Sequence, residues 1–86
     1  MAKSFNLTII NPYKTLYKGK VVSAIVPAAL GYLGILANHA PFLANLTAGK
    51  FILHEESGET KVLQYKSGGF LEILKNNVRI ILKSED

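Results

Sequence analysis

Cysteine is absent from this chain of 86 residues. The chain can therefore form neither a disulfide framework nor a thiolate metal site. No apolar run approaches the roughly 18–20 residues that a membrane-spanning helix needs. The N-terminus Met1-Ala2-Lys3-Ser4 leads directly into an alternating segment, which is not the pattern of a signal peptide. We expect a chain that stays in a reducing aqueous compartment and is stabilised by packing and strand pairing.

Acidic residues are also few: 6 Asp and Glu stand against 10 Lys and Arg, which gives a net charge of +4. That balance permits a nucleic acid, an anionic membrane surface or an acidic protein as partner. The best basic cluster joins Lys14, Lys18 and Lys20 to Tyr17, as in platforms that bind single strands. Because the cluster is short, a solvated strand edge is the favoured interpretation. A small basic β-barrel that binds nucleic acid stays open as the alternative.

The chain does have enough apolar material for a core. Hydrophobic residues make up 49% of it and charged residues 19%, which is too apolar for a disordered chain. A domain of this size buries roughly 60–65% of its surface. We expect one domain over residues 1–86, in which residues 84–86 form a polar tail.

Short strands separated by turn signals account for most of the chain. Phe5–Ile9 alternates apolar and polar residues, and Asn11-Pro12 ends it. Turns are expected at 18–20, 47–49, 55–59 and 75–77, with a kink or bulge at 67–69. The further strands expected are Tyr13–Tyr17, Val21–Val26, Phe42–Leu46, Lys50–His54, Lys61–Tyr65, Phe70–Leu74 and Val78–Leu82. With no convincing helical period, this pattern is typical of an all-β sandwich or barrel.

The most specific stretch is Gly31–Pro41, a glycine-punctuated apolar segment that ends in His39-Ala40-Pro41. It is interpreted as an extended loop held against the core, with a polar corner where it turns. Pro41 biases Ala40 toward an extended conformation. What this stretch contacts is therefore the main question about function.

Candidate catalytic and metal-binding residues are few. His54 lies beside Glu55 and Glu56, but a metal site needs more ligands than one histidine and flexible carboxylates at a hairpin tip. His39 has no nucleophile beside it, and Ser67-Gly68-Gly69 is not a nucleophile elbow. We therefore predict no catalytic residue, no metal and no cofactor. A small hydrolase that uses His39 stays a third possibility.

Glycine motifs for nucleic acids and phosphates do not fit either. Gly31-x-x-Gly34 is filled by Tyr32 and Leu33 and is surrounded by strands, unlike the clamp of the KH fold, which joins two helices. Gly49-Lys50 lacks both the upstream glycine and the following Ser or Thr of a phosphate-binding loop.

Three segments together resemble a known family. They are the opening strand Phe5–Pro12, the stretch Gly31–Pro41 with its Gly-x-Leu-Gly-Ile-x-x-x-His-Ala-Pro pattern, and Ser67-Gly68-Gly69-Phe70-Leu71-Glu72 followed by Asn77–Ile80. In this order and spacing they resemble the N-terminal β-sandwich domain of the epsilon subunit of F-type ATP synthases. The similarity runs from about residue 4 to residue 83.

The resemblance implies a flattened sandwich of two sheets with about eight to ten short strands. It also implies a non-catalytic subunit of the rotor, or central stalk, that joins the gamma subunit to the c ring and helps couple ion flow to ATP synthesis. The implied location is the cytoplasmic face of the bacterial plasma membrane, reached only through the complex.

The resemblance also implies which residues meet partners. The residues expected at the interface with gamma and the c ring are Gly31, Tyr32, Leu33, Asn38, His39 and Ala40; those expected to shape the backbone are Gly34, Pro41, Gly68 and Gly69. Phe42 is expected to help hold the stretch in shape rather than to meet a partner. The family commonly has an acidic residue after the first loop glycine, where this chain has Tyr32. An aromatic anchor is the expected replacement.

A second departure concerns the C-terminus. Most members of the family continue into a pair of C-terminal helices that can inhibit ATP hydrolysis, whereas this sequence stops at Asp86. Inhibition by that route is therefore not expected of it. The start at Met1 favours a natural short chain over a truncated one.

Overall fold

Alternation of apolar and polar residues gives most strands one buried and one exposed face, as in the buried Phe5, Leu7 and Ile9 of the first strand. The computed structural model describes residues 3–84 and contains eight strands and no helix in that range. The strands are β1 Phe5–Ile10, β2 Thr15–Ala28, β3 Gly31–Leu36, β4 Phe42–Leu46, β5 Gly49–Glu55, β6 Thr60–Tyr65, β7 Gly69–Leu74 and β8 Asn77–Leu82. Of the tail predicted over 84–86, only Ser84 lies among the described residues.

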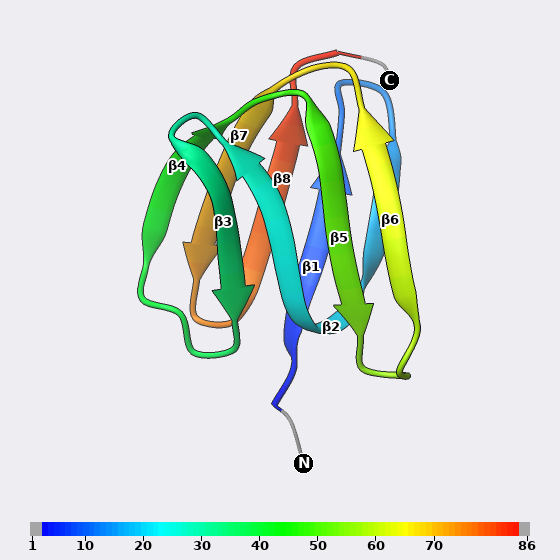
Figure 1. Ribbon diagram of the computed structural model, residues 1–86, viewed down its shortest axis with the longest axis vertical. Coiled ribbons are helices and arrows are strands. Elements are labelled where there is room, and N and C mark those ends of the chain that lie inside the picture. Colours follow the sequence, from blue (N-terminus) through cyan, green and yellow to red (C-terminus); the bar gives the residue numbers. More distant parts are fainter. Residues whose placement is uncertain (1–2, 85–86) are drawn as a thin grey trace.

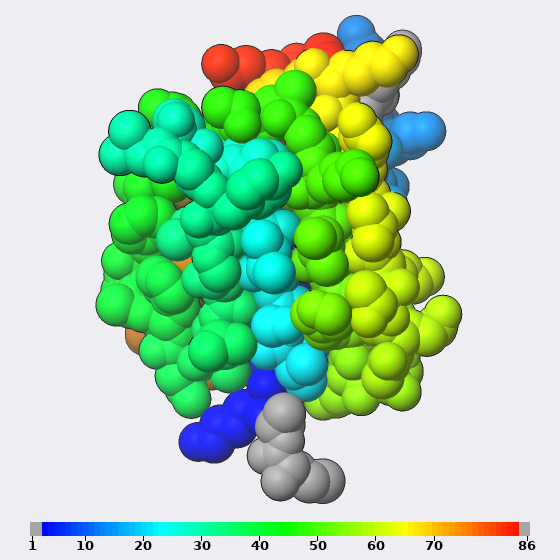
Figure 2. Space-filling view, viewed as in Figure 1, coloured from blue at the N-terminus to red at the C-terminus, as the bar shows by residue number. Residues whose placement is uncertain are grey.

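The strands form two layers that share β2 (Figure 1). In one layer the order is β4, β7, β8, β1 and the first half of β2, and β1 lies parallel to β8. In the other it is β3, the second half of β2, β5 and β6, which form the face seen in Figure 2. Between the layers lies one apolar core. The prediction of a flattened all-β sandwich is confirmed.

Strand β2 differs from the prediction, because a turn at Lys18-Gly19-Lys20 and a stop at Pro27 were both expected and neither exists. Lys18, Gly19 and Lys20 pair with β1. A Cβ atom at Gly19 would lie 2.9 Å from the Tyr17 hydroxyl oxygen, so glycine there makes room for the tyrosine ring. Pairing with β5 ends at Ile25, so the missing N–H of Pro27 costs no bond to β5.

The prediction of a loop over Gly31–Pro41 is also wrong for the first half of that stretch. Residues 31–36 form β3, which pairs with β2 from Ala28↔Gly31 to Ser23↔Leu36. Gly31 has φ of 126°, which suits the tight hairpin that joins β2 to β3. Because every residue of this segment pairs with a residue of β2, the segment forms a strand in spite of its two glycines.

Two adjacent glycines allow the chain to pass close to its neighbours. A Cβ atom at Gly68 would lie 2.4 Å from the Leu46 carbonyl oxygen, and one at Gly69 would lie 2.2 Å from the Ile81 carbonyl oxygen. Of the kink or bulge expected over 67–69, the kink is present, because the chain bends at Lys66 and Ser67. No bulge follows, since β7 begins at Gly69 and pairs without interruption with β4 and β8. At Gly34, in contrast, a Cβ atom would meet nothing within 4 Å.

We predict that Gly69→Ala lowers the free energy of unfolding by about 1–3 kcal/mol, the usual cost of overpacking a core. The clash is with backbone, which cannot move aside like a side chain. Chemical denaturation measures the effect. Gly34→Ala is the matched control and should leave stability nearly unchanged. Equal stability of the two variants would contradict the close approach at Gly69.

A second prediction concerns Tyr17, whose hydroxyl donates to the Glu55 carboxylate. Burial, together with this hydrogen bond and the Glu55 charge, raises the pKa of Tyr17 from 10.0 to about 12. The folded chain therefore keeps a proton that the unfolded chain loses above its lower pKa. This contribution to stability is complete below pH 10 and is lost as the pH rises to about 12.

Unfolding measured between those two pH values tests this. Tyr17→Phe should lose less stability over that interval than the wild type. Tyr13→Phe, which alters a tyrosine that is 77% exposed, is the control. Parallel stability curves for wild type and Tyr17→Phe would show that the Tyr17 proton is not linked to folding.

Candidate partner-binding surface

The residues expected at the interface form two groups rather than one. Gly31, Tyr32 and Leu33 lie at the start of β3, whereas Asn38, His39 and Ala40 lie in the turn after it. A strand rises about 3.3 Å per residue, so Tyr32 lies about 13 Å from Leu36, the last residue of β3, and the second group lies beyond that end.

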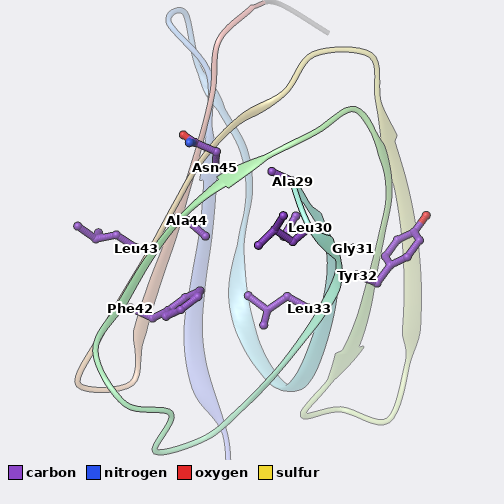
Figure 3. A pocket seen from close by; sticks show the side chains of 10 residues that line it. Ala29, Leu30, Gly31, Tyr32, Leu33, Phe42, Leu43, Ala44 and Asn45 are labelled. Atoms are coloured by element: carbon purple, nitrogen blue, oxygen red, sulfur yellow. The ribbon is translucent and has the colours of Figure 1, made fainter.

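The first group borders an apolar groove of about 460 Å³ at the open edge of the sandwich, between β3 and β4. None of its lining residues is charged; they are Ala28, Ala29, Leu30, Gly31, Tyr32, Leu33, Phe42, Leu43, Ala44 and Asn45. Figure 3 shows Leu30 and Leu33 pointing toward Phe42 and Ala44. Leu33 and Ala44 also pack on the core, so the groove floor is continuous with the rigid interior.

One wall of this groove was missed by sequence reasoning. Leu30 is fully exposed at the β2–β3 hairpin tip, and Phe42 and Leu43 are exposed along β4. The apolar run before Gly31 was a usable signal for the tip. Nothing local in the sequence indicates that β4 lies across from β3.

Tyr32 projects away from the groove, to the outer side of β3 (Figure 3). It is 66% exposed and pairs in register with Pro27 of β2. Leu36, two steps of the same face further along β3, is similarly exposed. The Tyr32 hydroxyl oxygen would lie 3.8 Å from a Cβ atom at Gly49 of β5, so the ring extends over the outer face of the sheet and most of it is open to a partner.

In the second group, His39 is oriented by its neighbours. Its Nδ1 lies 2.7 Å from the Ala40 carbonyl oxygen, which can only accept, so Nδ1 carries a proton. In the neutral ring, Nε2 is then the acceptor left for a partner. The ring also lies against Phe42, with centroids 5.7 Å apart. Phe42 therefore belongs both to the groove and to the support of His39.

Asn38 has φ of 64° and its side chain is engaged within the chain. The Asn38 N–H donates to Oδ1 of Asn76, and Nδ2 of Asn76 donates to Oδ1 of Asn38 at 3.0 Å. Both bonds join the turn after β3 to the turn between β7 and β8.

The basic cluster does not form the stacking platform that the alternative interpretation required. Lys18 and Lys20 lie on the outer face of β2, near Asn6, Thr8 and Asn77. The side chain of Tyr17 is on the opposite face, where it packs on the core and reaches Glu55. No aromatic ring of β2 therefore interleaves with these two lysines.

The polar hairpin tip between β5 and β6 is also engaged internally. His54 Nδ1 lies 3.0 Å from the Thr60 hydroxyl, and the Ser4 hydroxyl donates to Glu56 at 2.7 Å. Over residues 3–84 no group of His, Asp and Glu is arranged to hold a metal ion. That same range contains no helix long and apolar enough to cross a membrane.

Comparison with known proteins adds independent information. A family model described as "ATP synthase, Delta/Epsilon chain, beta-sandwich domain" matches residues 4–84. An ATP synthase epsilon chain from Dichelobacter nodosus is 42% identical over 85 residues, which cover 99% of this chain and 58% of the relative. One from Leptospira interrogans is 44% identical over 80 residues, 93% of this chain and 61% of the relative.

Two solved structures share the fold. A chain in the mitochondrial ATP synthase of Euglena gracilis (OSCP/F1/c-ring) superposes with a TM-score of 0.85 at 20% identity, over 94% of this chain and 51% of that one. A chain in the central stalk/c-ring of the Tetrahymena thermophila enzyme gives 0.74 at 17% identity, over 95% and 65%. This chain spans about three-fifths of the length of the curated relatives. From the match over residues 4–84, the chain belongs to the delta/epsilon chain β-sandwich family of ATP synthases.

Proposed function

We propose that this chain is a non-catalytic subunit of the rotor, or central stalk, of an F-type ATP synthase. In that role it links the gamma subunit to the c ring and helps couple ion translocation to ATP synthesis. The observation that carries the proposal is the uncharged groove at the open edge of a sandwich that belongs to this family. The names of the relatives and the assemblies that contain the structural neighbours support it.

The groove and the His39 turn are the surfaces we assign to partners. A surface with exposed leucines and aromatic side chains but no charge is suited to an apolar protein surface, because binding removes that area from water. Tyr32 takes the role of an aromatic anchor where the family commonly has an acidic residue. The chain then reaches the membrane only through the complex, at the cytoplasmic face in a bacterium.

We predict that Tyr32→Ala weakens binding to the rotor about tenfold or more, because exposed aromatic residues dominate many interfaces. The measurement is a pull-down and titration with the matching gamma subunit and the assembled rotor. Leu30→Ser, which removes a side chain that protrudes from the hairpin tip, should weaken binding as well. Tyr13→Ala is the matched control, since Tyr13 is an exposed tyrosine outside the groove.

Two results would count against the proposal. The first is a wild-type chain that binds neither gamma nor the rotor. The second, which concerns only the assigned surface, is full binding by both Tyr32→Ala and Leu30→Ser.

The rival hypothesis, binding of nucleic acid, has one supporting feature: Lys18, Lys20 and Arg79 share the outer face of β2, β1 and β8. It predicts oligonucleotide affinity that falls steeply with salt. We expect no measurable binding at low salt, because Tyr17 lies on the other face and offers no stacking surface. A salt-dependent binding curve would favour the rival.

A further inference from the structure

The His39 turn depends on a residue that is distant in the sequence. Asn76 lies 38 positions after Asn38, in the turn between β7 and β8, and the two asparagines exchange hydrogen bonds. Among residues 3–84, these two hydrogen bonds join the turn to another part of the molecule. The pair thus fixes where the turn begins relative to the other layer.

Asn76 is itself held in place. It has φ of 61°, a conformation that asparagine tolerates better than most residues. Its carbonyl oxygen accepts a hydrogen bond from the Asn6 N–H of β1 at 2.9 Å, and Asn6 Nδ2 reaches the Asn77 side chain at 3.3 Å. Through these hydrogen bonds, Asn76 links β1 to the turn after β3.

The consequence falls on His39, the next residue after Asn38. One side of the turn is fixed by Asn76 and the other by the contact of the His39 ring with Phe42. The bonds to Asn76 occupy the Asn38 N–H and Oδ1. Asn38 is thus better suited to holding the turn than to contacting a partner.

We propose that Asn76 is a positioning residue for partner binding, which holds the His39 turn in the shape that the rotor recognises through its paired bonds to Asn38. The inference rests on the proposed function. Asn76 lies outside the stretch Gly31–Pro41, so binding would depend on a residue beyond that stretch. Asn76 needs no contact of its own with the partner for this role.

The first test uses the chain alone. Asn76→Gly keeps the positive φ accessible but removes the side chain that bonds to Asn38. Amide hydrogen exchange of Asn38 should become about three- to tenfold faster, the change expected from one hydrogen bond of ordinary strength. Lys75→Gly, at a neighbouring position with φ of 50°, introduces the same residue in the same turn and should leave that exchange unchanged.

The second test is binding to the gamma subunit and rotor. Asn76→Gly should weaken binding about three- to tenfold, and Lys75→Gly should not. In a His39→Ala background, Asn76→Gly should have no further effect, because the group that it positions is gone. A general loss of stability would instead weaken binding in both backgrounds.

The outcomes separate the two proposals. If the wild type does not bind the rotor, the proposed function fails, and Asn38 exchange still decides whether Asn76 holds the turn. If the wild type binds, the inference is overturned by an Asn76→Gly variant that binds the rotor as tightly as Lys75→Gly does. An equal effect of Asn76→Gly with and without His39 also overturns it.

Discussion

The pairing of one strand with four others organises this molecule. β2 hydrogen-bonds to β1 through its first half and to β5 and β3 through its second half, and it meets β4 at Ala28. The register shift between Val21 and Ser23 marks the point where it passes from one layer to the other. Because both layers contain the same strand, their separation and relative orientation are set by the backbone as well as by side-chain packing. The open edge between β3 and β4 is a consequence, since β3 has β2 as its neighbour and β4 has β7.

Backbone proximity provides the second constraint. At Gly68 and Gly69 the chain passes so close to Leu46 and Ile81 that no side chain fits. This close approach lets β7 lie between β4 and β8. The two glycines of the Ser-Gly-Gly segment therefore have a steric cause.

Local patterns were sufficient for the strands that show clear alternation between turn residues, whether their partner is a neighbour in sequence, as in β5–β6, or distant, as for β4 and β7. The hairpins β5–β6 and β7–β8 and the strands β1 and β4 were expected close to their observed bounds, because alternation and turn residues specify them. Lys18-Gly19-Lys20 and Gly31–Leu36 were interpreted wrongly because pairing with β1 and β2 overrides the local preference of glycine for turns. For the candidate site, the sequence indicated Tyr32 and His39, and Phe42 as a support of the stretch. It indicated neither the place of Phe42 in the groove wall nor the role of Asn76. Those relations depend on which edges and turns come together in the folded chain.

Under the proposed function, the separation of the two candidate groups has a physical meaning. Tyr32 and His39 stand at opposite ends of β3, which is paired along its full length with β2 and has Ile35 in the core. A paired strand hardly changes its length, so contacts at its two ends keep a fixed spacing. A flexible loop over the same residues could reach the same contacts, but it would stretch or bend when a force acted between them. The proposed role, in which the chain transmits rotation between two partners, requires the stiffer arrangement. The strand β3 provides it where the sequence pattern had indicated a loop.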